Sequence, residues 1–159
     1  MKLRWLSTCL LSAIVLVSAV IAGCGSVDVE VGQATPTATP LPTIQVSLLI
    51  HVSEDDARWF RDFEVLKGTN AYELTEQATE GNLESTYYAS FFAHFVESIV
   101  GVPNEGDNYW LIFQWNGSAE QWEPLPVGAD LFSLKDSHVL AWSYTDTSLD
   151  PQPLPSVKP

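Results

Sequence analysis

The feature that most constrains the fold is an aromatic stretch over residues 108–117. It reads Asn-Tyr-Trp-Leu-Ile-Phe-Gln-Trp-Asn-Gly. Alternate side chains of a strand point to opposite faces, and here both sets are largely apolar. The stretch therefore predicts a strand inside a sheet that is covered on both sides. The closing Asn116-Gly117 pair is a strong signal for a two-residue hairpin turn.

The segments before this strand predict a sheet with one helix. Within residues 44–52, every second residue is apolar, from Ile44 to Val52, which indicates a strand with one buried face. An acidic and aromatic excursion over residues 53–62 follows, and residues 63–66 indicate a short second strand. Asn70, with Glu73 three residues later, is typical of a capping box at the start of a helix.

Residues 87–102 fit both a helix and a strand. Aromatic and apolar residues recur there at helical spacing, but also at every second position. We expect a strand over part of this segment, because of a family resemblance given below. After the Asn116-Gly117 turn, residues 139–144 predict the last strand. This order of elements predicts an α+β fold with one main helix packed across a mixed sheet.

The N-terminus carries an export signal. Two basic residues precede an apolar run over residues 10–21, which ends in Ile21-Ala22-Gly23-Cys24. The length and the flanking residues indicate a secretory signal rather than a spanning helix. The ending resembles a bacterial lipobox, which predicts a signal peptide over residues 1–23 and lipidation at Cys24 by palmitate-like acyl chains. Two or three acyl chains would anchor the protein stably. The alternative interpretation of this N-terminal segment is an ordinary signal peptide or a retained membrane anchor.

Composition divides the rest of the chain. Residues 24–43 form a Thr/Pro-rich tether, residues 44–146 the folded domain, and residues 147–159 a Pro-rich tail that we expect to be disordered. The formal net charge is −13, which disfavours binding to nucleic acid. Together with the leader, this acidity predicts a protein at the extracytoplasmic face of the cell membrane.

The chemically active side chains do not predict an enzyme. The three histidines, His51, His94 and His138, fall on separate elements, so we do not expect them to converge on a metal. Cys9 lies in the leader, and Cys24 carries the predicted lipid, so no thiol is left for catalysis. The sequence also contains no nucleophile or phosphate-loop motif. We expect no catalytic residue, no metal and no resident cofactor.

Tryptophans are more numerous than a small domain usually needs for packing. Five of the six follow the leader: Trp59, Trp110, Trp115, Trp122 and Trp142. Two of them, Trp59 and Trp122, lie among polar residues that we expect to form loops. There they could form a flat platform for a ligand, although a core filled by large rings is the alternative.

Four motifs, taken in this order, resemble a transcobalamin C-terminal-like domain, the DUF4430 family. They are a Gly-Thr opening before a helix at residues 65–69, an Ile-x-Gly-Val turn within residues 95–104, the strand and turn at 108–117, and the closing strand at 139–144. The resemblance implies a β-grasp-like fold. It also carries over two ligand-contact positions, Tyr109 and Trp110.

The resemblance also implies a binding function. In the cobalamin carriers of higher animals, the similar domain closes over one face of the corrin while a helical barrel holds the other. Because no such barrel is apparent in this sequence, we expect only half of a site. The sequence therefore predicts a lipid-anchored binding module for a cobalamin-like ligand or a partner protein. A structural or adhesive accessory domain without a small-molecule ligand is the alternative.

Overall fold

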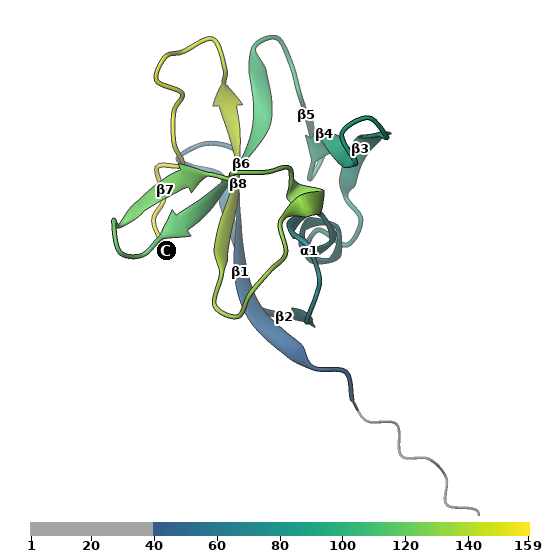
Figure 1. Cartoon of the computed structure of the whole chain (residues 1–159). Helices are drawn as coiled ribbons and strands as arrows, with labels where there is room; N and C mark the ends of the chain where they lie inside the picture. The colour runs from purple at the N-terminus through teal and green to yellow at the C-terminus, as the bar shows by residue number, and fades with distance from the viewer. Residues whose placement is uncertain (1–39) are drawn as a thin grey trace, which may run out of the picture. The chain divides into compact units, whose positions relative to one another are not determined.

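The computed structural model describes residues 40–159, and the leader and the lipidation predicted at Cys24 lie outside the described residues. A five-stranded sheet has the strand order β2-β1-β8-β6-β7, and a three-stranded sheet has the order β3-β4-β5 (Figure 1). The strands of the larger sheet are β1 (Thr43–His51), β2 (Ala57–Leu66), β6 (Asn108–Asn116), β7 (Gln121–Pro124) and β8 (Val139–Asp146).

The smaller sheet and the helices lie on one side of the larger sheet (Figure 1). They are β3 (Leu83–Tyr88), β4 (Ala93–Ile99), β5 (Val102–Pro103), the helix α1 (Ala71–Ala78) and the short 3₁₀ helix η1 (Ala129–Leu131). β1 pairs in parallel with β8, and the other strand pairs are antiparallel. The predicted α+β class with one main helix and a mixed sheet is thus confirmed. Within residues 40–159, no helix is long and apolar enough to cross a membrane.

The predicted helix is present, and its cap explains where it starts. The Asn70 side chain accepts a hydrogen bond from the Glu73 amide, and the Glu73 carboxylate accepts one from the Asn70 amide, so the capping box is confirmed. Leu74 and the other apolar residues of the helix are buried against β1 and β8. Trp142 of β8 donates from its indole Nε1 to the hydroxyl of Thr75 at 2.7 Å, which fixes the helix on the sheet.

β6 confirms the two-faced strand. Trp110 packs into the core on the α1 side, and Phe113 packs into a second core on the opposite side. The predicted two-residue turn is wrong, because Asn116 pairs with Gln121 and leaves a four-residue loop between them. The Asn116 side chain accepts hydrogen bonds from two loop amides, and this local bonding stabilises the longer loop.

Two segments differ from the sequence expectations. The second strand runs over ten residues, because most of the expected excursion at 53–62 pairs with β1 as an edge strand. Its charged side chains point to solvent, which hid the strand from the hydrophobic pattern. The ambiguous segment 87–102 contains β4 and β5 and the last two residues of β3, so the expectation of a strand there is confirmed.

The end of the chain contacts the second core. The main-chain oxygen of Val157 accepts a 2.8 Å hydrogen bond from the Trp122 indole, and the Ser156 hydroxyl lies 3.1 Å from His51 Nε2. Pro155 is buried, and Figure 1 shows the C-terminus beside β7. These contacts differ from the disorder that the composition predicted for residues 147–159. The tail has no regular secondary structure, but its end covers the sheet face opposite α1.

Candidate binding site

The most unusual surface is the hairpin formed by β3, residues 89–92 and β4, which we call the aromatic hairpin. Its large side chains are exposed instead of buried: Tyr87 52%, Tyr88 46%, Phe91 71%, Phe92 69% and Phe95 46%. Single exposed apolar residues are ordinary, but five neighbouring aromatic rings on one hairpin are not. Exposed apolar side chains that gather in this way mark interaction sites.

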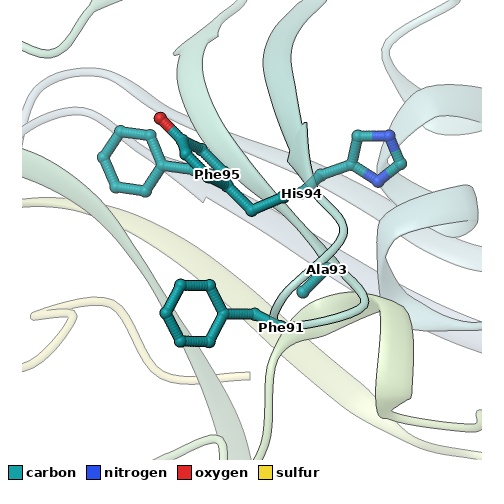
Figure 2. A pocket seen from close by; sticks show the side chains of 5 residues that line it. Phe91, Ala93, His94 and Phe95 are labelled. Carbon is teal, nitrogen blue, oxygen red and sulfur yellow. The ribbon is translucent and has the colours of Figure 1, made fainter.

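One face of the aromatic hairpin is hollowed into an open pocket of about 390 Å³. Tyr88, Phe91 and Phe95 form its walls, and the small Ala93 leaves room between them. In Figure 2, the rings of Phe91 and Phe95 lie to one side of the strand, whereas the imidazole of His94 points to the other. The pocket therefore presents aromatic rings and almost no polar atoms to a ligand.

Tyr109 extends this aromatic surface toward the larger sheet. Its ring meets that of Phe95 edge to face, with the ring centroids 6.3 Å apart. Tyr109 lies at the start of β6 and is half-buried. Of the four ligand-contact residues predicted from the sequence, Tyr109 is the one that adjoins the pocket.

The back of the hairpin is fixed by His94. Its main-chain amide donates to one carboxylate oxygen of Asp130 at 2.8 Å, and its Nδ1 lies 2.6 Å from the other. A carboxylate only accepts hydrogen bonds, so the imidazole donates from Nδ1. The imidazole also stacks on Tyr72 of α1, with centroids 4.1 Å apart and planes 6° apart. These contacts hold β4 to α1 and η1, so the strand that carries the pocket is fixed from behind.

The other predicted contact residues lie elsewhere. Trp110 and Trp122 are only 5% and 3% exposed, so little of either ring is free to touch a ligand. The sequence suggested that Trp59 and Trp122 lie in loops, but they lie in strands β2 and β7. Their rings stack 6.5 Å apart, and Arg61 covers Trp59 at 4.1 Å. Both therefore belong to the packing of the second core.

The aromatic hairpin was not among the predicted binding residues. Only the secondary structure of residues 87–102 was predicted, although residues 85–95 contain five aromatic residues and no Lys, Arg, Asp or Glu. That combination was the available signal, because a buried strand of similar composition would alternate with polar positions or be covered by other elements.

The surroundings of the other two histidines, His51 and His138, indicate a structural role. His51 is buried, and its Nδ1 lies 3.0 Å from the Ser143 hydroxyl. Burial lowers the pKa of His51, and the negative charge of Glu54 opposes this in part. Burial, followed by the charge of Lys135, lowers the pKa of His138. Within residues 40–159, no group of three or more metal-ligating side chains lies together.

Comparisons with known proteins show the fold. No protein-family model and no curated protein matches the sequence. The chain is similar to haptocorrin in a complex with Cbi, with a TM-score of 0.52 and 16% identity over 67% of this chain and 26% of that chain. It is also similar to a "putative metal binding protein" from Ruminococcus gnavus ATCC 29149, with a TM-score of 0.51 and 12% identity over 65% of this chain and 97% of that chain.

The two likenesses differ in how much of each neighbour is matched. This chain spans about a quarter of haptocorrin but nearly the whole of the bacterial protein. The fold is therefore transcobalamin-like, and it makes up nearly the whole of the bacterial chain.

Proposed function

We propose that this protein is a non-enzymatic binding module that holds its ligand against the pocket of the aromatic hairpin. The observation that carries the proposal is the set of exposed rings at Tyr88, Phe91 and Phe95 around a hollow of about 390 Å³. An aromatic wall with few polar atoms suits a ligand with a broad apolar face. Anchoring of His94 by Asp130 lowers the ordering cost of binding.

A corrinoid is the ligand class that we propose. The support is the shared fold with haptocorrin, solved with Cbi, together with the resemblance of residues 44–144 to the DUF4430 family and its β-grasp-like arrangement. The pocket is open, so it covers one face of a large planar ligand and leaves the other to solvent or to a partner protein. We expect modest affinity, with a Kd between about 1 μM and 1 mM.

We also propose that the module is lipid-anchored at Cys24 on the extracytoplasmic face of the cell membrane. The support is the lipobox-like ending of the leader and the Thr/Pro-rich tether over residues 24–43. In this arrangement the acyl chains hold the protein at the membrane. Without Lys2 and Arg4 of the leader, 5 basic and 20 acidic residues remain, and a net charge of −15 gives no attraction to anionic lipids.

Calorimetric titration with cobinamide and with cobalamin tests the ligand. The protein would be the mature chain, residues 24–159, with Cys24→Ser so that no lipid is attached. Phe95→Ser removes a pocket ring that is 46% exposed, so a ligand can bury about half of it. Since full burial of such a side chain contributes about 1.5–3 kcal/mol, binding should weaken about three- to tenfold. Leu66→Ser is the control, because Leu66 is similarly exposed at 49% but lies on the edge strand β2.

Two results would contradict the proposal. The first is no heat of binding and no spectral change for either corrinoid up to about 1 mM, where even half-site binding is measurable. The second is binding that Phe95→Ser and Leu66→Ser weaken equally, which would place the ligand away from the pocket.

A further inference from the structure

The tip of the aromatic hairpin, residues 89–92, carries two exposed phenylalanines, of which only Phe91 also lines the ligand pocket. We propose that this tip enters the interfacial layer of a lipid bilayer. Phe91 and Phe92 are the side chains that enter, and they are 71% and 69% exposed. Phe92 does not line the pocket, so its exposure is not explained by ligand binding.

The first observation is the absence of charge along the hairpin. The chain contains 7 basic and 20 acidic residues, yet none lies between Glu84 and Glu97. A charged side chain near the tip would have to lose water on entering the membrane, at a large cost. The single ionisable imidazole there, that of His94, points away from the Phe91 side and is bonded to Asp130.

The second observation is the order of the rings along the hairpin. The two phenylalanines occupy the turn, and Tyr87 and Tyr88 occupy the end of β3 just behind it. Apolar rings favour the deeper layer, whereas tyrosine, with its polar hydroxyl, favours the headgroup level. The hairpin therefore presents its side chains in the order that a membrane interface requires.

The backbone of the tip also suits a shallow position. The Phe91 amide donates to the Tyr88 main-chain oxygen at 3.0 Å, which closes the turn internally. Phe92 has a φ of 51°, an uncommon conformation for a bulky residue, which the surrounding turn must hold in place. Unpaired backbone groups are tolerated at the interface but not in the hydrocarbon core, so we expect entry at interfacial depth only.

A bilayer is the occupant to which the proposal commits, and the preceding chain supplies the reason. The predicted lipid site at Cys24 lies sixteen residues before Pro40, where the described domain begins. A chain of that length spans at most about 55 Å, so an anchored domain stays within reach of the bilayer. The membrane proposal rests on the lipid anchor at Cys24 that is part of the proposed function. The affinity of the tip for lipid can nevertheless be measured without the anchor.

The experiment uses the mature chain, residues 24–159, with Cys24→Ser, and vesicles of zwitterionic phosphatidylcholine. Co-sedimentation should show partition that is insensitive to salt, because apolar rings and not charges drive it. Phe92→Ser should lower the partition coefficient about tenfold, within the range for losing one buried aromatic side chain. Leu149→Ser, an exposed apolar control at 50%, should leave it unchanged.

Each other outcome overturns the proposal. These are no partition at several millimolar lipid, binding that requires anionic lipid, or equal losses for Phe92→Ser and Leu149→Ser. Self-association that Phe92→Ser abolishes would instead assign the tip to a second copy of the chain. Corrinoid titration of the same variants separates the two proposals, because Phe92→Ser should lower lipid partition and leave the corrinoid Kd within about twofold.

Discussion

The carboxylate of Asp130 fixes the aromatic hairpin, and replacing it tests whether the site is preformed. Asp130 accepts two hydrogen bonds from His94, at 2.8 Å and 2.6 Å. A hydrogen bond to a charged group contributes about 1.5–3 kcal/mol. The His94 and Asp130 side chains are 28% and 13% exposed, so water can replace part of what Asp130→Ala removes. We therefore expect Asp130→Ala to lower the free energy of unfolding by about 2 kcal/mol, below the sum for two such bonds.

Urea unfolding, followed by tryptophan fluorescence, measures this loss of free energy. In thermal unfolding, the same loss should lower the Tm by roughly 6–10 °C for a domain of about 120 residues. Asp130→Asn keeps one accepting oxygen and should lose about half as much. Asp136→Ala is the matched control, because the two hydrogen bonds that Asp136 accepts, from the Gln45 amide at 2.9 Å and from the Ser137 hydroxyl at 3.4 Å, are both exposed. If Asp130→Ala and Asp136→Ala cost the same, within about 0.5 kcal/mol, the hairpin is not held by this carboxylate.

Two further predictions concern the core and the anchor. His51 has a lowered pKa in the folded state, so the unfolded state binds more protons once the pH falls below about 6.5. The stability advantage of the wild type over His51→Gln should therefore shrink between pH 7.5 and pH 5, and a pH-independent difference in urea unfolding would refute this. Cys24→Ala should leave the protein without acyl chains in mass spectra, and an acylated variant would overturn the lipobox assignment.

The elements that the sequence predicted correctly have local causes. The helix follows from Asn70 and Glu73, whose side chains bond to amides only three residues apart. The first strand follows from apolar residues at every second position, and the aromatic strand follows from a short, nearly continuous apolar run that ends at a turn signal. No information from distant parts of the chain is needed for any of these, because each pattern matches one type of element.

The elements that the sequence missed depend on distant partners. Trp122 lies between Gln121 and Glu123, and this polar context suggested a loop. The same pattern also fits a strand with one buried face. The choice between the two is made by Trp115 across the strand pair and by the tail residue Val157, which accepts the indole hydrogen bond. Neither partner can be inferred from the residues around Trp122.

The candidate site was missed for a related reason. Exposure is a property of the whole fold, and a run of aromatic residues normally predicts core. The fold instead anchors the hairpin from behind, through Asp130 and the stacked ring of Tyr72, without using the rings at its tip. Because the rings of Phe91 and Phe92 are mostly in solvent, replacing them should change the stability by no more than about 0.5 kcal/mol. A loss of ligand or lipid binding in such variants can then be assigned to the surface itself and not to unfolding.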